Sequence, residues 1–353
     1  MGKIKDTSKL QSFNSRAFGV EIEFVAPRNI VGDNNGAYQG ARVDAARAIQ
    51  NKANEILNAN IVVGDPNNCE DAVEIVAEGY NHETREHWKI VNDGTARPTQ
   101  RQIRNGLIGG FELVSPILKG ETSMKQLKAI LEAMRILGFD VSRHCGLHVH
   151  HDVRNWRQEL RSNDYSKNEA AMNKISNCIT LVQKFENVIY GMLPESRRNG
   201  RWCQPLNQTY NSVFHCLNGK ATHTKKEKMA YLKNNQKSHR NQATFQNDRY
   251  CGLNFQSMFK HGTVEFRYGA PTLSFEKLSN WIVFTQAFVN MSEAWTTVNS
   301  VKEMKIGTKA EVRLTFEKMR DTLGLVKRMC QDDFQREASL WIRKRFDHFN
   351  PMS

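Results

Sequence analysis

The sequence predicts an α+β fold, in which helices pack on a largely antiparallel sheet, and three observations support this prediction. Alternating apolar and polar residues, the pattern of a strand, occur at 18–25, 111–117, 146–153 and 263–268. Apolar residues at helical spacing occupy longer stretches between and after these strands. Strands and helices do not alternate regularly, as they would in a series of parallel βαβ units, so an antiparallel sheet explains their order better.

The first half of the chain contains three of the strands and two helices. In the first strand, apolar side chains point to one face and two glutamates to the other. In each helix, apolar residues recur at intervals of three or four, and Gly138 follows the second helix as a stop signal. The expected helices cover 42–57 and 122–137, and the expected strands cover 18–25, 111–117 and 146–153.

The second half is expected to be mainly helical. Pro194 ends a long amphipathic helix, and Ser274 is suited to cap a later one. The expected ranges are 168–192 for the long helix, 250–259 and 263–268 for two strands, and about 309–329 and 333–346 for the last two helices.

The chain is expected to form one domain with two irregular parts. Residues 1–15 predict a polar, mobile lead-in, and residues 16–353 predict a single catalytic domain that ends in helices at about 309–347. A basic segment at about 195–249, rich in Asn, Gln, Lys and Arg, predicts an insertion or mobile loop that holds a short helix near 225–232.

The composition is that of a globular protein with a strong positive charge. The 353 residues include 50 Lys and Arg against 37 Asp and Glu, which gives a formal net charge of +13. This charge favours a polyanionic partner, such as nucleic acid, nucleotide phosphates or an acidic substrate. A merely basic surface would give the same charge.

Other features of the sequence favour the cytoplasm. No apolar run approaches the ~18 residues that a membrane helix needs, so no membrane partner is expected. The N-terminus has no apolar signal region. Seven cysteines without a Cys-x-x-Cys pair argue against a disulfide framework and a zinc ribbon.

Four of the expected strands carry ionisable side chains on one face. Residues two apart on a strand point the same way. An antiparallel sheet also exposes a polar face to water, which is the alternative explanation. Carboxylate and imidazole groups together suit a divalent cation that holds phosphate oxygens, and an arginine would contact the same phosphates. The residues are Glu21 and Glu23, Glu112, His148 and His150, and Glu265 and Arg267.

The third strand also offers a different interpretation. The run from His148 through His150 to Asp152 partly matches the His-x-His-x-Asp-His run of binuclear metal hydrolases, but Val153 occupies the last position. A metal-dependent hydrolase that uses His148, His150 and Asp152 therefore remains an alternative. The sequence contains no P-loop, no Gly-x-Gly-x-x-Gly, no Gly-x-Ser-x-Gly and no His-Glu-x-x-His.

Two smaller features each have a structural and a functional interpretation. Cys145 precedes a glycine close to two histidines, and a buried, inert thiol is favoured over a nucleophile. Residues 92–95, Asn-Asp-Gly-Thr, are typical of a turn, which is favoured over a role of Asp93 in a site.

Taken in order, these segments resemble the amidoligase family, a branch of the glutamine synthetase and glutamate–cysteine ligase superfamily that is common in bacteria and their phages. The similar blocks run from about residue 16 to residue 290. They are Phe-Gly-Val-Glu21-Ile-Glu23-Phe, Trp88-Lys-Ile-Val-Asn-Asp93-Gly-Thr, Gly110-Phe-Glu112-Leu-Val-Ser-Pro, Cys145-Gly-Leu-His148-Val-His150-His-Asp, Leu253-Asn254-Phe and Thr263-Val-Glu265-Phe-Arg267-Tyr-Gly.

The resemblance implies a curved antiparallel sheet that binds ATP together with Mg²⁺ or Mn²⁺. The residues at metal-ligand positions would be Glu21, Glu23, Glu112, His148 and Glu265. ATP would contact Arg267, His148 and Asn254, catalysis would involve Arg267, Glu265 and His150, and the substrate would lie near Asp93 and Gly146.

The reaction that the resemblance implies joins a carboxylate substrate to an amine substrate. ATP would activate the carboxylate as an acyl phosphate, and the amine would then form an amide or peptide-type bond. A nucleic-acid-associated protein with a secondary metal site is a further alternative, because of the net charge of +13. If the protein is a ligase, its positive charge would suit an anionic acceptor substrate, such as a nucleic acid. The sequence is also compatible with an oligomer.

Overall fold

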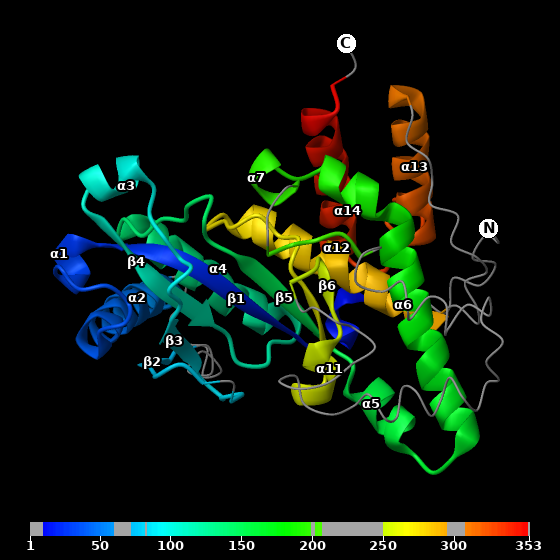
Figure 1. Cartoon of the computed structure of the whole chain (residues 1–353), viewed down its shortest axis with the longest axis horizontal. Coiled ribbons are helices and arrows are strands. Elements are labelled where there is room, and N and C mark those ends of the chain that lie inside the picture. Colours follow the sequence, from blue (N-terminus) through cyan, green and yellow to red (C-terminus); the bar gives the residue numbers. More distant parts are fainter. Residues whose placement is uncertain are drawn as a thin grey trace. The chain divides into compact units, whose positions relative to one another are not determined.

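The structure, a computed structural model, describes residues 10–59, 72–81, 83–198, 202–206, 250–294 and 308–351. Over these residues, seven strands form one open sheet in the order β2-β3-β4-β1-β5-β7-β6. The strands β2 and β3 are parallel, whereas β1–β4, β3–β4 and β6–β7 are antiparallel. The predicted α+β fold is therefore confirmed (Figure 1).

The chain divides into two compact units by its internal contacts. Unit 2 comprises Asn14–Val149 and Gly269–Ser279, and unit 1 comprises Met1–Phe13, His150–Tyr268 and Asn280–Ser353. The strand β5 (Leu147–Asp152) and the helix α12 (Phe275–Ala294) belong in part to each unit. A single catalytic domain over 16–353 stays a prediction.

Unit 2 is built on four strands that have an apolar face. Ile22, Leu113 and Ile90 lie in one row across β1, β4 and β3, and all three are fully buried. In the next row, the rings of Phe24 and Phe111 stack with centroids 5.4 Å apart. The strands are β1 (Phe18–Pro27), β2 (Ile75–Ala77), β3 (Trp88–Asn92) and β4 (Leu107–Val114).

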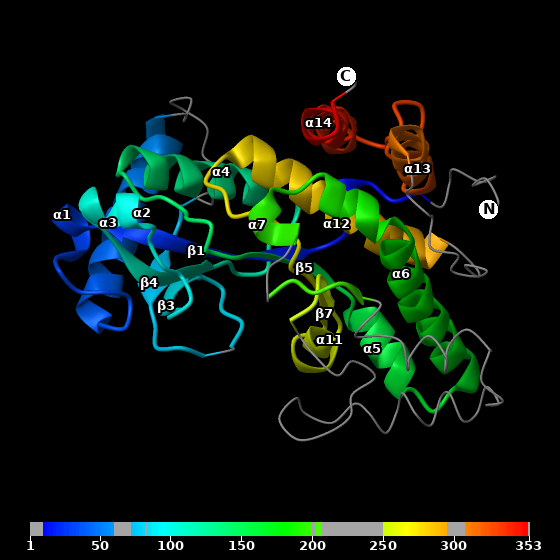
Figure 2. The same ribbon diagram turned by 45° about the horizontal axis from the view of Figure 1, so that its top comes forward.

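Two long helices of unit 2 lie on these strands (Figure 2). They are α2 (Gln39–Ala59) and α4 (Gly120–Ile136), close to their predicted ranges. Gly138 follows α4 with φ +81°, a left-handed conformation that glycine adopts without strain, so the predicted stop is confirmed. Two shorter helices in unit 2 are α1 (Arg28–Val31) and α3 (Gln100–Arg104).

The glycine pair in β4 lets a loop approach the sheet closely. A Cβ atom at Gly109 would lie 2.2 Å from the carbonyl oxygen of Ala96. The backbone of Gly110 forms two hydrogen bonds with this loop. Its N–H donates to Ala96 O at 2.7 Å, and its carbonyl accepts from Asp93 N at 3.0 Å. Larger side chains would push this loop away. The pair therefore fixes Asp93 beside the sheet.

The connection from α4 to β5 runs alongside β1. Val25 and Asp140 exchange both backbone hydrogen bonds, at 2.8 and 3.1 Å. Further on, Glu23 N donates to Gly146 O at 3.1 Å. The entry of the chain into β5 is thus aligned with the strand that carries the first two glutamates.

Unit 1 is largely helical around the strands β6 (Leu253–Asn254) and β7 (Thr263–Phe266). Its core contains Phe185, Phe284 and Phe288, all fully buried. The helices are α5 (Arg154–Arg161), α6 (Tyr165–Gly191), α7 (Glu195–Arg198), α11 (Gln256–Lys260), α13 (Lys309–Thr322) and α14 (Asp333–Phe349), and η2 (Phe13–Ser15) is a 3-10 turn at the start of the described chain.

Two predicted elements in unit 1 are shorter than expected. Of the strand predicted at 250–259, only Leu253–Asn254 is a strand. It ends there because Asn254 Oδ1 accepts from Gln256 N at 2.9 Å and the chain turns into α11. The helix predicted at 309–329 ends at Thr322, where Gly324 follows with φ +71°.

Part of the predicted mobile lead-in is packed. Phe13 is fully buried and lies against Phe334, with ring centroids 4.9 Å apart. Its N–H donates to Asp332 Oδ2 at 2.6 Å. Residues 1–9 lie outside the described residues, and so do 207–249, most of the predicted basic insertion with its short helix.

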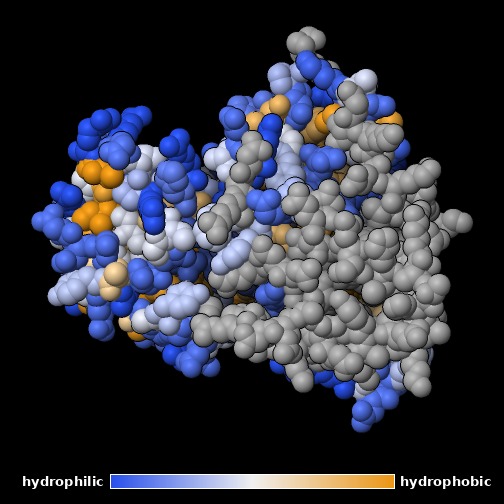
Figure 3. Space-filling model, viewed as in Figure 1, coloured by the Kyte–Doolittle hydropathy of each residue, from blue (hydrophilic) through white to orange (hydrophobic). Residues whose placement is uncertain are grey.

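On the face shown in Figure 3, hydrophilic residues predominate among the coloured residues, and hydrophobic colour occurs in small patches. Within the described ranges, no helix is long and apolar enough to cross a membrane.

Candidate metal centre

The register of β1 and β4 brings three glutamates to one face of unit 2. Glu23 lies opposite Glu112, and Glu21 lies opposite Val114. Because side chains alternate along a strand, all three carboxylates point away from the apolar face that holds Ile22. The grouping that the two-residue spacing predicted for Glu21 and Glu23 is therefore present, and β4 adds Glu112 to it.

Five residues of this face form two overlapping sets of potential metal ligands. In the first set, one ligand atom each from Glu21, Glu112 and His148 lie within 4.8 Å of one another. In the second, the same holds for Glu23, Asp93 and Glu112. Hard divalent cations such as Mg²⁺ and Mn²⁺ prefer oxygen ligands of this kind. Since Glu112 belongs to both sets, the arrangement suits two neighbouring cations.

Much of this face is buried, in contrast to the water-exposed polar face that was the alternative explanation of the pattern. Glu23, Glu112 and His148 are only 6%, 7% and 6% exposed. Alternation alone cannot show whether a polar face is covered. Close, buried carboxylates repel one another when all are ionised, and a bound divalent cation offsets that repulsion.

His148 is held by its neighbour on β1. Its Nδ1 lies 2.9 Å from Glu21 Oε2, within hydrogen-bond distance. A histidine that ligates a metal is commonly oriented by a carboxylate in this way. The contact therefore fits either a ligand role or an orienting role for Glu21.

Gly146 is the residue that leaves room for two of the potential ligands. A Cβ atom at this position would lie 2.6 Å from Glu23 Oε1 and 3.0 Å from His148 Nε2. The sequence suggested a substrate role for Gly146, and the structure places it directly beside the candidate ligands.

Asp93 combines the turn and the site that the sequence offered as alternatives. Its Oδ1 accepts hydrogen bonds from Thr95 N at 2.7 Å and from Thr95 Oγ1 at 2.6 Å. The same hydroxyl lies 3.4 Å from Glu23 Oε2. Thr95 was missed by the sequence reasoning, although a hydroxyl two residues after an aspartate is a usual signal of such a turn.

Lys89 is a second residue that the sequence reasoning missed. It lies on the carboxylate face, in one row with Val114 and Glu21, and is 3% exposed. Its Nζ donates to Asn81 Oδ1 at 2.7 Å and to the carbonyl of Glu83 at 2.8 Å. Burial lowers the pKa of Lys89, and the negative charges of nearby glutamates oppose this effect. The available signal was a lysine inside a short apolar strand.

Glu78, in the same segment as Asn81, is a carboxylate with its own partners. Arg85 Nε donates to it at 2.9 Å, and His87 Nε2 lies 3.1 Å from it. Burial alone would raise the pKa of Glu78, but hydrogen bonds from Arg85, Asn81 and His87 and the charge of Arg85 outweigh it and lower the pKa to about 2.

The remaining predicted residues lie in unit 1. Glu265, 4% exposed, forms an ion pair with Arg267, and Asn254 Nδ2 donates to Glu265 Oε2 at 2.6 Å. The guanidinium of Arg267 also lies 6.0 Å from the ring centre of Tyr250. His150 Nδ1 lies 2.9 Å from the hydroxyl of Thr263. Arg267 thus pairs with Glu265 within unit 1, and its role in catalysis stays a prediction.

A family model described as "Putative amidoligase enzyme" matches residues 14–289 of the chain. The match covers most of the sequence and includes every residue of the two ligand sets. The chain belongs to this amidoligase family. The predicted resemblance is therefore confirmed, and the assignment supports an enzyme of the ligase type.

Other comparisons add little to the family assignment. A search of curated proteins gave no match. A bifunctional glutathione synthetase from Pasteurella multocida has a solved structure with a TM-score of 0.37 and 10% identity to this chain. The similarity covers 96% of this chain and 47% of the other, so the amidoligase spans about half the length of that protein.

The contacts of Asp152 do not favour the alternative interpretation, a metal-dependent hydrolase that uses His148, His150 and Asp152. Asp152 accepts hydrogen bonds from Arg154 Nε at 2.9 Å and Nη2 at 2.6 Å. His151 is fully buried, with Nε2 2.8 Å from the hydroxyl of Thr285. Among the described residues, Asp152 belongs to no set of three potential metal ligands.

Cys145 has the character of a structural thiol. It is 1% exposed and packs with Val25 and Ala96. Burial raises the pKa of the Cys145 thiol to about 11, so the thiolate that a nucleophile needs is scarce near neutral pH.

Proposed function

We propose that this amidoligase is an ATP-dependent carboxylate–amine ligase that works through an acyl phosphate. The observation that carries the proposal is the pair of ligand sets that share Glu112, since ATP is bound by ligases as a complex with divalent cations. Membership of the amidoligase family supports the kind of bond that is formed.

The proposed reaction has two steps. A carboxylate oxygen of the first substrate attacks the γ-phosphorus of ATP, and ADP leaves. The amine nitrogen of the second substrate then attacks the acyl carbon, the carbon–oxygen bond to phosphate breaks, and the nitrogen loses a proton. Neither step needs a covalent nucleophile from the protein, in keeping with the high pKa of Cys145.

The residues of unit 2 would hold the cations. In the proposal, Glu21, Glu23, Glu112 and His148 are ligands, and Asp93 completes the second set, a role beyond the substrate contact that the resemblance implied. Bound Mg²⁺ or Mn²⁺ would neutralise the charge of the phosphate oxygens. Gly146 keeps the space that Glu23 and His148 need.

The assignments in unit 1 follow the resemblance to the family. We propose that Arg267 contacts the γ-phosphate, that Glu265 is a further cation ligand, and that His150 and Asn254 assist in the reaction and in ATP binding. The ion pair of Arg267 with Glu265 supports a fixed guanidinium, which is suited to bidentate phosphate contact.

The partners in the proposal are a carboxylate and an amine, and the net charge of +13 favours an anionic acceptor. The preference for an anionic acceptor is based on this net charge alone. An acceptor that binds through charge should show a KM that rises steeply with salt.

The test is nucleotide binding and ADP release by the full chain. We expect calorimetry to detect ATP binding only with Mg²⁺ or Mn²⁺, and Glu23→Gln to remove it. Glu83→Gln, which removes an exposed carboxylate elsewhere in unit 2, is the matched control. Mixtures of carboxylates and amines should stimulate ADP release. Equal ATP affinity with and without cations would refute the proposal, and DNA binding that is insensitive to Glu23→Gln would favour the nucleic-acid alternative.

A further inference from the structure

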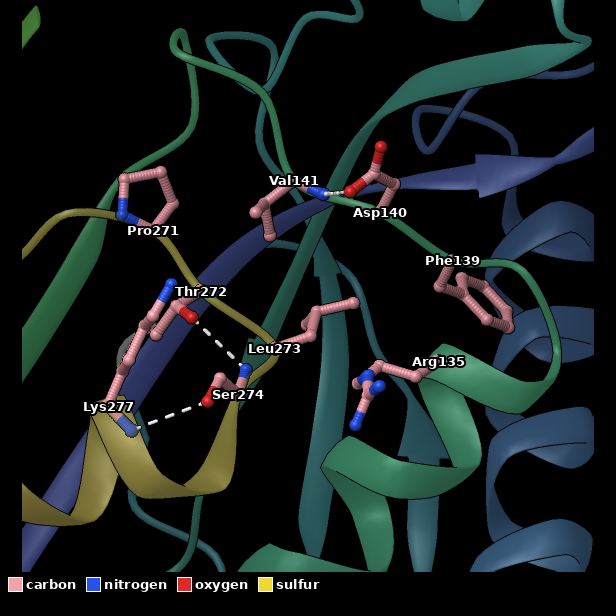
Figure 4. Close-up of a pocket in the computed structure, with 9 residues that line it drawn as sticks. All are labelled: Arg135, Phe139, Asp140, Val141, Pro271, Thr272, Leu273, Ser274 and Lys277. Atoms are coloured by element: carbon pink, nitrogen blue, oxygen red, sulfur yellow. Dashed lines mark hydrogen bonds between the residues drawn. The ribbon is translucent and has the colours of Figure 1, made fainter.

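Unit 2 contains a pocket that shares no residue with the candidate metal centre. Its volume is about 380 Å³, and it is lined by the end of α4, by residues 139–141 and by residues 271–277, where α12 begins (Figure 4). The candidate centre draws instead on β1, β4, β5 and the turn after β3. A volume of several hundred cubic ångströms is in the range of small-molecule sites.

One side of the pocket is apolar. The accessible part of this side comes from the half-buried Pro271 and Val141, whereas Phe139 and Leu273 are only 4% and 7% exposed. Val141 also packs against the small apolar cluster around Val25 and Cys145. The apolar side is thus anchored in the core of unit 2 and provides a surface for a hydrocarbon chain or a ring.

Two cations line the pocket. Arg135 reaches it from α4 and Lys277 from the first turn of α12, and Leu273 lies between them in the close-up view (Figure 4). Among the described residues, neither side chain forms a hydrogen bond or an ion pair. Two unpaired cations beside an apolar surface are a favourable environment for an anion.

The acid that lines the pocket does not neutralise these cations. Asp140 Oδ2 accepts from Gln102 Nε2 at 2.8 Å, and Asp140 Oδ1 accepts from Val141 N at 2.8 Å. The two oxygens therefore have partners other than the cations, one from α3 and one from the neighbouring backbone. The hydroxyls of Thr272 and Ser274 accept backbone hydrogen bonds from Ser274 and Lys277, and each keeps a proton to donate.

We propose that this pocket binds a small organic anion. Its carboxylate or phosphate group would contact Arg135 and Lys277, and its apolar or ring portion would pack on Pro271 and Val141. Because the pocket and the metal centre have no residue in common, this inference is independent of the proposed function.

The test uses two anions that carry the same ring. Phenyl phosphate and benzoylglycine represent the phosphate and the carboxylate, and benzyl alcohol is the neutral comparison. Each is titrated by calorimetry into the full chain in EDTA, because both anions also bind divalent cations. We expect at least one anion to bind at least about tenfold more tightly than benzyl alcohol.

The double variant Arg135→Gln/Lys277→Gln should weaken that binding at least about tenfold. Lys128→Gln, which removes an exposed cation from α4 outside the pocket, should leave it within about twofold. Binding of only one of the two anions would identify the group that the pocket prefers. If neither anion binds, or if the double variant binds both as the wild type does, the inference is wrong, whatever the outcome of the ATP experiment.

Discussion

Unit 2 contains largely buried carboxylates in two different surroundings. Glu78 is 13% exposed and is surrounded by donors and a positive charge: Arg85, Asn81 and His87. At the candidate metal centre, Glu23 and Glu112 are buried to a similar degree, yet a carboxylate oxygen of Asp93 lies within 4.8 Å of one from each. The chain surrounds Glu78 with its own donors, whereas it gathers acids where we propose that a cation binds.

The Glu265–Arg267 pair of unit 1 resembles Glu78 rather than the metal centre. Its carboxylate has an arginine from the same strand and an amide from Asn254. Glu265 therefore differs from the acids of the candidate metal centre in the same way as Glu78 does, because its own segment supplies donors to it.

The largest expected effect is at Glu112, the residue that both ligand sets share. We expect Glu112→Gln to weaken Mn²⁺ binding at least about 100-fold, because each set loses a charged ligand. In EDTA its melting temperature should equal or exceed that of the wild type, since like charges are removed.

A Mn²⁺ titration monitored by electron paramagnetic resonance measures the affinity, and melting curves in EDTA measure the stability. Glu132→Gln on the exposed side of α4 controls for net charge. Unchanged Mn²⁺ affinity together with a lower melting temperature would show that the cluster is structural.

Glu78 should show the opposite behaviour. We expect Glu78→Gln to destabilise the fold by roughly 1–3 kcal/mol, because charged hydrogen bonds to Arg85 and His87 are lost, while Mn²⁺ affinity is unchanged. Glu83 is also a partner of Arg85, but its side chain is 66% exposed. We expect Glu83→Gln to lower the free energy of unfolding by less than about 0.5 kcal/mol. Urea unfolding at neutral pH measures both.

The effect of Glu78 should also depend on pH. Its pKa falls from an ordinary 4.5 to about 2 in the folded protein, so ionised Glu78 stabilises the fold fully above about pH 4.5. This contribution is lost as pH falls toward 2. The difference in unfolding free energy between the wild type and Glu78→Gln should therefore shrink over that range. A constant difference would contradict the assigned pKa.

Local patterns were sufficient to predict much of the fold. The two-residue alternation predicted β1 and the side of the strand that Glu21 and Glu23 share, and the helical spacing before Gly138 predicted α4. Prediction failed at 250–252 and at 255–259, and after Asn254 the strand ends because the Asn254 side chain accepts a hydrogen bond from Gln256 N.

The candidate site was predictable only in part. Lys89 shares a face with Glu21 through a register that joins three strands, and such a register is not visible in any one segment. The burial of Glu23 likewise depends on how distant segments pack. Thr95 was accessible from the Asp-Gly-Thr pattern, but its contact with Glu23 was not.

Gly146 tests whether the space beside the ligands matters. We expect Gly146→Ala to weaken Mn²⁺ binding by about 10- to 100-fold, because the new methyl group displaces Glu23 Oε1, while the stability in EDTA changes by less than about 1 kcal/mol. Glu23 Oε1 is at the end of a flexible side chain, so it can move with little loss of stability. The same measurements as for Glu112→Gln apply. Retained Mn²⁺ affinity would place the cation elsewhere.

The smallest expected effect is at Thr95, whose side-chain hydroxyl contacts both Asp93 and Glu23. Thr95→Val keeps the shape of the side chain but removes the donor to Asp93 Oδ1 and the contact with Glu23 Oε2. Asp93 belongs to only one of the two ligand sets, so we expect Mn²⁺ affinity to fall by no more than about tenfold. Thr95→Ser retains the hydroxyl and should bind Mn²⁺ as the wild type does. If the valine and serine variants lose affinity equally, the methyl packing of Thr95 holds the turn, and the hydroxyl does not orient Asp93.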